Sequence, residues 1–357
     1  MMKIVMKKKN DMRKIFLVLA LLMTAFTAIS QKFSAVCESG QTLYYNIIDE
    51  ENHYVELRRE GYQLFSGDII IPGEVTYNGT VYTVKGIGSM AYYDCEGLTS
   101  VVIPNTITYI GESAFNCCLN LTSVNIPESV ENIGPLAFSS TKINEIYIPR
   151  SVKNIGYSIG QFDKITVSPD NPFYDSRNDC NAIIDSRGDT LVLATPNTVV
   201  PNDIKAIGMC AFRFIKSLTS FNIPSSVTYI GVLAFSESGL KSIVIPKTVE
   251  CVAGGAFWYC NSLTSVTIES PTTKMYGDGG SFMLGAIAYC PLVTLSLSTT
   301  PVKLEKGTFE IVTKVWGYPY EDEEGDYVPT YYIWVPSGMA KAYNETDWAK
   351  VFIIKDE

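Results

Sequence analysis

The sequence predicts a β-rich fold in which short strands and single helical turns stack coil upon coil into a solenoid. The first observation is a unit of about 22–23 residues that recurs along most of the chain. The second is that apolar residues occupy the same positions in every unit. The third is composition, because 46% hydrophobic residues in a chain of 357 are enough to form a sizeable core. We therefore do not expect a mostly disordered chain.

The first half of the unit has the pattern IGxxAF. Its copies begin at Ile87, Ile110, Ile133, Ile207, Ile230 and Val252. We expect the glycines to take a positive backbone φ in a tight turn, at Gly111, Gly134, Gly208 and Gly231. The GxxAF segment is expected to form one helical turn on the side away from the strands. The aromatic residue of each copy is expected to stack in an internal ladder formed by Tyr92, Phe115, Phe138, Phe212, Phe235 and Phe257.

The second half of the unit has the pattern LTSVxIP and predicts a short strand. Its copies span residues 98–104, 121–127, 143–149, 218–224, 240–246 and 263–269. In the first copy Leu98, Val101 and Ile103 are expected to point inward, and Pro104, which has no N–H to donate, is expected to end the strand. Such a strand cannot bury its apolar face alone, so neighbouring units must stack at about 4.8 Å.

One position in each strand lies between the last two buried residues and points to the opposite face. These positions are the candidate ligand-binding residues Val102, Asn125, Tyr147, Asn222, Val244 and Thr267. They are mostly small and uncharged, so they would bind through shape, hydrogen bonds and a few aromatic rings. The competing interpretation is a solvated sheet surface, with recognition placed in the loops near Asp175 and Glu321.

The repeat is interrupted twice and closed at both ends. Residues 31–82 are expected to form a small N-terminal β cap, and residues 83–330 the solenoid. Insertions near 169–203 and 270–286 are rich in Asp, Asn and Gly and are expected to be loops, the first around one altered repeat. Before the first interruption, Gly160 occupies the aromatic position of the unit that begins at Ile155. Residues 331–357 are expected to form a C-terminal cap with a strand at 331–335 and a helix after Ser337, while Trp348 and Phe352 cover the open end.

The first thirty residues have the pattern of a signal peptide. A basic segment with Lys7, Lys8, Lys9, Arg13 and Lys14 precedes an apolar run over residues 15–29, which is short for a membrane span. We expect cleavage before Gln31 and export, although an uncleaved N-terminal anchor is the alternative. No later apolar run reaches membrane length, so no transmembrane span is expected in the mature chain. The net charge of −9 becomes more negative after cleavage, which argues against nucleic acid as a partner.

With these motifs, the chain resembles the BspA-type leucine-rich-repeat family of bacterial surface and secreted proteins. The resemblance extends from about Phe33 to the C-terminus. It includes the interruption DSRNDCNAII at residues 175–184 and the ending IWVPSGMAKAY at residues 333–343. The resemblance implies adhesion or protein recognition outside a Bacteroides-type bacterium, and it implies no catalytic residues.

Few residues suggest catalysis, a cofactor or a metal. The only histidine is His53, which is expected to be a solvated strand residue outside the repeats. The acidic run at residues 321–326, and Asp175, Asn178 and Asp179, could bind calcium but lack evenly spaced ligands. Gly277, Gly279 and Gly280 lack the rest of a phosphate-binding motif. We therefore expect no enzyme activity, no cofactor and no metal.

Three of the nine cysteines, Cys95, Cys118 and Cys260, each lie three residues before the first Leu of a strand. This regular placement indicates a structural position. Stacked neighbours there could lie within disulfide range, but free cysteine behaves as a small buried hydrophobic residue, so we favour thiols over disulfides.

The leading functional hypothesis is a non-enzymatic, extracellular binding or adhesion module, secreted or held at the cell surface. Its expected partner is a protein or glycoprotein, such as a host matrix protein, a mucin or another bacterial surface. One alternative is glycan capture, suggested by Tyr109, Tyr147 and Tyr229. Another is a structural role in the cell envelope.

Overall fold

The computed structural model describes residues 31–62, 64–269, 273–275, 290, 294–296, 331–335 and 352–356. The predicted signal peptide, the acidic run at 321–326, most of the insertion at 270–286, and the helix expected after Ser337 lie outside these residues. The β-rich fold class is confirmed. Among the described residues the helical structure is limited to one short 3-10 helix, η1 (Arg177–Asp179).

The strands fall into four groups along the chain. The first group extends to the first IG motif and consists of β1 (Lys32–Val36), β2 (Thr42–Asp49), β3 (Tyr54–Arg58), β4 (Ser66–Ile70), β5 (Glu74–Tyr77) and β6 (Thr80–Ile87). The second consists of β7 (Gly97–Val102), β8 (Tyr109–Ile110), β9 (Ser123–Val124), β10 (Asn132–Ile133), β11 (Glu145–Ile148), β12 (Asn154–Ile155) and β13 (Lys164–Val167).

The third group lies in the interruption of the repeat and consists of β14 (Tyr174–Asp175), β15 (Ala182–Asp185) and β16 (Thr190–Ala194). The fourth consists of β17 (Ala206–Ile207), β18 (Tyr229–Ile230), β19 (Ser242–Ile245), β20 (Cys251–Val252), β21 (Ser265–Ile268), β22 (Lys274–Met275), β23 (Thr294–Ser296), β24 (Tyr331–Val335) and β25 (Phe352–Asp356).

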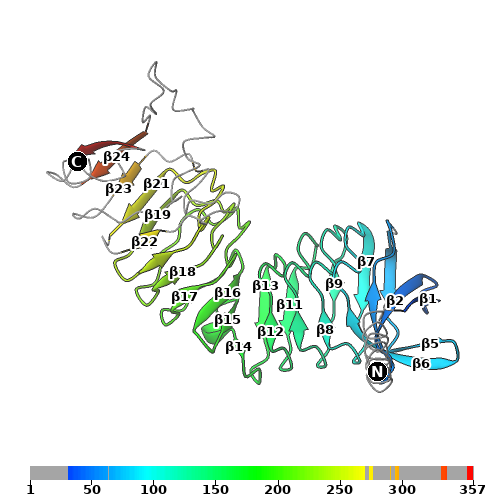
Figure 1. The fold of residues 1–357 in the computed structure, drawn as a ribbon. Helices are drawn as coiled ribbons and strands as arrows, with labels where there is room; N and C mark the ends of the chain where they lie inside the picture. The colour runs from blue at the N-terminus through cyan, green and yellow to red at the C-terminus, as the bar shows by residue number, and fades with distance from the viewer. Residues whose placement is uncertain are drawn as a thin grey trace, which may run out of the picture.

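Equivalent residues of successive repeats pair side by side in parallel strands. Ile87 pairs with Ile110, and Ile110 with Ile133, along the sheet formed by the IG halves of the repeats. On the strand half, Val101 pairs with Val124. The chain therefore winds in coils whose strands form two separate ladders, as Figure 1 shows.

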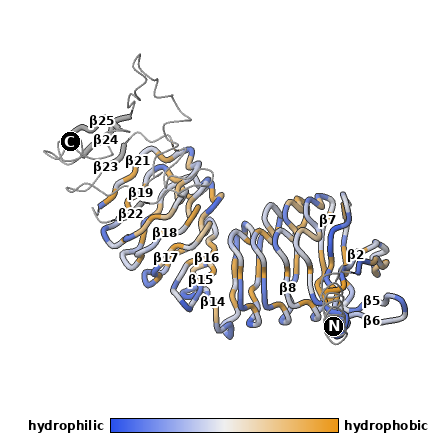
Figure 2. The backbone as a smooth tube through the Cα atoms, viewed as in Figure 1, coloured by the Kyte–Doolittle hydropathy of each residue, from blue (hydrophilic) through white to orange (hydrophobic). Residues whose placement is uncertain are grey.

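The coils form two stacks that meet at an angle near β13 and β14 (Figure 1). The first stack contains the coils with β6 to β13, and the second the coils with β16 to β23. Each has its own group of buried side chains: the first extends to Tyr174, Ile183 and Leu193, and the second begins at Cys180. Hydrophobic segments recur from coil to coil in both stacks, as Figure 2 shows.

The glycines of the IG motif do not have a positive φ, so that prediction was wrong. They are required by close stacking of backbones. A Cβ on Gly111 would lie 2.6 Å from the Ser89 nitrogen, and one on Gly134 would lie 2.5 Å from the Glu112 nitrogen. The same crowding occurs in the second stack at Gly208 and Gly231. Only a residue without a side chain lets successive coils approach this closely.

The segment after each glycine is not a helical turn, so this prediction was also wrong. In the first copy the N–H of Ala91 donates to the Gly88 carbonyl and that of Cys95 to the Tyr92 carbonyl. Met90 and Asp94 have φ values of 58° and 63°. A positive φ at the third residue is typical of a type II turn, so two consecutive turns replace the expected helix.

These turns are also bonded from coil to coil. The N–H of Tyr92 donates to the Ala114 carbonyl, and that of Phe115 donates to the Ala137 carbonyl, both at 2.8 Å. In the last pair of coils of the first stack, the Phe138 N–H donates to the Ile159 carbonyl at 2.7 Å. The turns therefore form a third ladder of backbone hydrogen bonds beside the two strand ladders.

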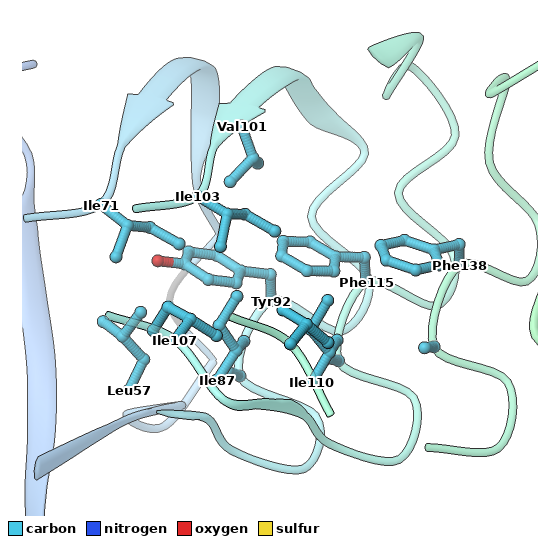
Figure 3. Packing of buried hydrophobic residues seen from close by; sticks show 14 of the residues in the cluster. Leu57, Ile71, Ile87, Tyr92, Val101, Ile103, Ile107, Ile110, Phe115 and Phe138 are labelled. Carbon is cyan, nitrogen blue, oxygen red and sulfur yellow. The ribbon is translucent and has the colours of Figure 1, made fainter. Parts of the chain in front are cut away.

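The aromatic ladder is present, but it is divided between the stacks. Tyr92, Phe115 and Phe138 are stacked with ring centroids 5.1 and 5.5 Å apart. Figure 3 shows their rings in line inside the first stack, with Ile103, Ile107 and Ile110 around them. In the second stack the rings of Phe212, Phe235 and Phe257 are 5.0 and 5.3 Å apart. These spacings are close to the distance between coils.

The interruption near residues 169–203 is largely folded, in contrast to the expected loop. β14 and β15 pair antiparallel, as do β15 and β16, and β16 then pairs parallel with β17. Ile183, Ile184 and Leu191 in these strands are buried. Since β15 is apolar on both faces, it is placed between the two stacks, and the polar residues around it form the turns.

The segment expected as an N-terminal cap contains strands that already follow the coil pattern. β1 and β2, and β2 and β3, pair antiparallel. β3, however, pairs parallel with β6, and β4 pairs parallel with β7 in a register that aligns Ile70 with Val102. Ile69, Ile70 and Ile71 thus occupy the positions of a repeat strand. At the other end, the strand expected at 331–335 is β24, and it pairs parallel with β25.

Candidate functional site

The six candidate positions lie on the outer face of the strand ladder, but in two sets. Val102, Asn125 and Tyr147 belong to the first stack, and Asn222, Val244 and Thr267 to the second. Exposure is 50% for Val102, 45% for Tyr147 and 47% for Val244. Asn125 and Asn222 are also exposed, and Thr267 is half-buried. Asn222, Val244 and Thr267 are neighbours in the ladder, because Asn222 pairs with Val244 and Val244 with Thr267.

Asn125 differs from the other candidates because its side chain is used within the fold. Its Oδ1 accepts a hydrogen bond from the Ile103 N–H, and its Nδ2 donates one to the Ile103 carbonyl, both at 2.9 Å. The carboxamide thus satisfies the backbone of the preceding strand at the point where β9 ends. This role makes Asn125 primarily a structural residue of the ladder.

Two residues extend the outer face beyond the six predicted positions. Ile70, 40% exposed, is the ladder neighbour of Val102, and exposed Thr166 is the neighbour of Tyr147. A signal for both was present in the sequence. Ile70 lies two residues before Pro72, as Val102 lies two residues before Pro104. Thr166 lies between two buried residues of a strand that is followed by Pro169. We define the outer strand face as the outward-pointing residues Ile70, Val102, Asn125, Tyr147 and Thr166 of the first stack with Asn222, Val244 and Thr267 of the second.

The three tyrosines that suggested glycan capture do not form one platform. Tyr147 is on the outer strand face, whereas Tyr109 and Tyr229 belong to β8 and β18 on the IG side of their stacks. The Tyr109 hydroxyl donates to Glu56 Oε2 at 2.6 Å, and its ring occupies the space that a side chain on Gly86 would need. Tyr109 is therefore held in the fold rather than presented to a ligand.

A shallow groove runs along the IG side of the first stack, with a volume of about 520 Å³. Tyr109, Asn132 and Asn154 are side by side in it, and the Asn154 Nδ2 donates to Asn132 Oδ1 at 2.7 Å. The two amides satisfy each other in part, and the groove is widely open. It is a weaker candidate for a ligand site than the outer strand face.

A more enclosed cavity of about 280 Å³ lies where the two stacks meet. We call it the junction pocket. Its walls come from the last coil of the first stack, from the end of β16 and from the first coil of the second stack, and they include Ser158, Gly160, Phe162, Ala194, Arg213 and Phe214. Gly160 lacks the aromatic side chain of the ladder, and the buried Phe162 ring occupies the space beside it. The sequence indicated the break at Gly160 but gave no sign of a pocket.

The interruption carries a cluster of charges in which one arginine contacts three carboxylates. Arg177 forms ion pairs with Asp175 at 2.8 Å, Asp189 at 2.9 Å and Asp203 at 3.0 Å. Burial raises the pKa of Asp175, but hydrogen bonds from Arg177 and Ser186 outweigh this effect, so its pKa is below the ordinary value. Asp175 is therefore engaged in an ion-pair network that joins η1 to the end of β14 and to the turns that contain Asp189 and Asp203.

Asp175, Asn178 and Asp179 do not form a metal site in this structure. Across the residues that the structure describes, there is no group of three or more His, Cys, Asp or Glu side chains arranged to hold a metal ion. His53 lies in the turn between β2 and β3 with a φ of 53°, not in a strand, and its ring packs edge-on against Tyr82.

The nine cysteines all lie within the described residues, and all are thiols. Cys118 and Cys260, at the regular position before a strand, are buried thiols that donate to the carbonyl of a ladder residue in the preceding coil, whereas the Cys95 thiol accepts from the Phe65 N–H. Cys118 Sγ is 3.0 Å from the Tyr92 oxygen, and Cys260 Sγ is 3.0 Å from the Phe235 oxygen. Burial raises the pKa of Cys118 to about 12, which makes it unreactive at neutral pH. This placement explains the regular spacing without a disulfide.

The repeat geometry can now be compared with known proteins. The family described as the BspA type leucine rich repeat region matches residues 75–167 and 194–315, in six copies. The chain belongs to the BspA-type leucine-rich-repeat family. The segment between the two matched ranges contains β14, β15 and most of β16, so the BspA-type pattern is lost where the stacks meet.

Solved structures of other bacterial leucine-rich-repeat proteins are similar to this BspA-type chain. A leucine-rich repeat protein from Eubacterium ventriosum is 18% identical, with a TM-score of 0.53 over 80% of this chain and 84% of the other. The pneumococcal vaccine antigen PcpA is 16% identical, with a TM-score of 0.52 over 91% of this chain and 98% of the other. These similarities support the fold. A comparison with curated proteins found no match.

The described part of the chain contains no helix with the length and apolar character needed to cross a membrane.

Proposed function

We propose that this BspA-type protein is an exported, non-enzymatic binding module that contacts a protein or glycoprotein outside the cell. The observation that supports it best is the outer strand face. Three large apolar side chains of the first stack, Ile70, Val102 and Tyr147, are each 40–50% exposed on one side of it. Exposed apolar residues gathered on one surface are typical of interaction sites. Export rests on the basic and apolar pattern of the first thirty residues.

Tyr147 is the residue we expect to contribute most to binding. Its ring is exposed on a strand whose other face is buried, so the backbone beneath it is fixed before a partner arrives. Tyrosine is enriched among the residues that dominate protein interfaces. The surrounding outer strand face is largely uncharged, so the partner would be recognised by shape and hydrogen bonds. A carbohydrate-binding platform formed by tyrosines receives less support, because the exposed tyrosines lie on different sides of the stacks.

Binding of the full exported chain to immobilised matrix proteins, mucins and bacterial surfaces would test the proposal, with polysaccharides as a separate arm. For a ligand found in this way, Tyr147→Ser should weaken binding roughly thirtyfold, the effect of losing about 2 kcal/mol at an interface anchor. Tyr229→Ser is the matched control, because Tyr229 is 40% exposed but lies on the IG side. It should leave the affinity unchanged.

Two results would count against the proposal. One is the absence of binding to any protein or glycoprotein surface. The other is equal loss of affinity in the two tyrosine variants, which would separate binding from the outer strand face. Selective retention by polysaccharides, abolished by free sugar, would favour glycan capture instead.

A further inference from the structure

The ladder of turn hydrogen bonds stops at the junction pocket. In the preceding coil, the N–H groups of Leu136 and Phe138 donate to the carbonyls of Tyr157 and Ile159. The equivalent donors one coil later are those of Ser158 and Gly160, both in buried residues. Ser158 shares the positive φ of Leu136. Within the described residues, neither of these two N–H groups has an acceptor.

These donors face the second stack, because every coil of the ladder donates in the same direction along the stack. The junction pocket lies on that side and is lined by both residues. A buried N–H without an acceptor costs about 1–3 kcal/mol. The pocket therefore presents two backbone donors that a bound group would satisfy.

A third donor comes from the opposite wall. The guanidinium of Arg213 is held by Glu237, whose Oε1 is 3.1 Å from Nη2, while the buried Nε of Arg213 has no acceptor in the described part of the chain. Ser158 of the first stack lines the pocket together with Cys210 and Arg213 of the second. The backbone donors and the guanidinium thus converge on the same pocket.

The charges and the size of the junction pocket decide which group fits. Its charged lining consists of Arg213, Lys216 and Asp163, and Glu237 pairs with Arg213 beside it, so the charges balance and the backbone donors are the groups left without a partner among the described residues. Converging N–H donors beside a guanidinium suit a carboxylate. A volume of about 280 Å³ is at the lower limit for small-molecule sites, which are about 300–1,000 Å³, and suits one side chain.

The backbone around the pocket favours an extended peptide as the carrier of that side chain. Donors of the first stack lie on one wall, and the carbonyl of Arg213 on the other wall accepts no backbone N–H within the described residues. In an extended segment, a backbone N–H beside the acidic residue can donate to the Arg213 carbonyl, while the acidic side chain accepts from the donors of the first stack. Phe162, Leu193 and Phe214 supply apolar contacts for its flanking residues.

We propose that the junction pocket binds the carboxylate of an Asp or Glu side chain on an extended segment of a partner protein. Ser158 N–H, Gly160 N–H and Arg213 Nε would donate to the carboxylate, and Lys216 would contribute positive charge at the rim. The junction pocket is separate from the outer strand face, so either binding proposal can be contradicted without affecting the other.

An array of octapeptides, acetylated at the N-terminus and amidated at the C-terminus, tests this proposal. The central residue is Glu, Gln, Asp or Asn, and the flanking positions are varied. The full chain should retain peptides with Glu or Asp about tenfold better than their amide counterparts, the effect of losing one charge-assisted hydrogen bond. Arg213→Met should remove this preference.

A matched pair of variants checks the location. Ser217→Trp places a large ring at the exposed rim of the junction pocket and should abolish peptide retention. Ser220→Trp makes the same change at an exposed position outside the pocket and should leave retention unchanged. Both lie on the surface, so neither should alter the melting temperature.

The proposal is overturned if acidic and amide peptides are retained equally, or if Ser217→Trp and Ser220→Trp behave alike. It is also overturned if Gln peptides with a free C-terminal carboxylate are retained as well as the amidated Glu peptides. That result would assign the pocket to chain ends rather than to acidic side chains. If Arg213→Met proves less stable than the native chain, Lys216→Met is used in its place. A preference for acidic peptides that is unchanged in Lys216→Met would also overturn the proposal.

Discussion

Phe138 and Tyr147 belong to the same coil but have opposite environments. Phe138 is fully buried and stacked on Phe115, whereas Tyr147 is nearly half exposed on the outer strand face. The contrast separates a residue that stabilises the fold from one available for binding.

Phe138→Ala should lower the free energy of unfolding by about 3–5 kcal/mol, because it leaves a cavity within the aromatic ladder. Tyr147→Ser removes a ring that remains in contact with solvent and should cost about 1 kcal/mol or less. Urea unfolding followed by circular dichroism measures both values. Similar costs for the two variants would show that the outer strand face contributes to the core.

The glycines show what sequence reasoning at the residue scale can and cannot find. The IG motif marked the right positions, but their cause was misassigned to a positive φ. A single repeat contains no information on how closely the next coil approaches it, and this distance is what excludes a side chain at Gly111. The positive φ is taken by Met90, Ser113 and Leu136, whose residue types give no hint of it.

At the scale of elements, the strands followed from the sequence better than the turns. The strand pattern LxxVxI correctly marked Leu98, Val101 and Ile103 as buried. The turns satisfy their backbone by bonding to the next coil, so helical hydrogen bonds are unnecessary. A helical turn was the simpler expectation for one repeat considered alone. The folded interruption was missed because its polar residues outnumber the few apolar ones that form β15 and β16.

The ion-pair network around Arg177 stabilises this interruption in a pH-dependent way. The pKa of Asp175 is lowered in the folded protein, so the unfolded chain binds its proton more readily than the folded chain does. The stabilisation is therefore complete above the unfolded pKa of about 4, and it is lost as the pH falls through the lower folded value.

Asp175→Asn should cost roughly 1 kcal/mol at neutral pH, since Asp175 is partly solvated. The difference from the native chain should shrink as the pH falls from about 5 to about 2. Chemical unfolding across this range measures the effect. Asp170→Asn is the control, an exposed carboxyl in the same segment that has no ion pair among the described residues. A difference that stays constant with pH would mean that Asp175 does not act through its charge.

At the scale of the whole molecule, the sequence predicted one solenoid with an insertion, whereas the structure has two stacks at an angle. The break at Gly160 and the 52-residue gap between Ile155 and Ile207 were visible in the sequence. The angle was not, because it depends on how β15 packs between the stacks. At this junction, hydrogen bonds from side chains take the place of backbone pairing between strands. Asn181 accepts from the Ile165 N–H and donates to the Asp163 carbonyl.

This junction should divide the protein into two units of stability. Repeat proteins are stabilised mainly by contacts between neighbouring coils, so a local defect is transmitted only where the ladders are continuous. The turn ladder stops at Ser158 and Gly160, and the buried residues form two groups on either side of the junction. Damage in one stack should therefore have little effect on the other.

Phe115→Ala and Phe235→Ala form a matched pair for this prediction, because both rings are fully buried within the aromatic ladder of their own stack. Hydrogen exchange followed by mass spectrometry should show faster exchange in residues 83–160 for Phe115→Ala and in residues 204–268 for Phe235→Ala. Each change should lower the local free energy of opening by about 3–5 kcal/mol and leave the other stack within about 0.5 kcal/mol of the native value. Equal acceleration in both stacks by either variant would show that β14, β15 and β16 couple them into one cooperative unit, despite the interrupted ladder.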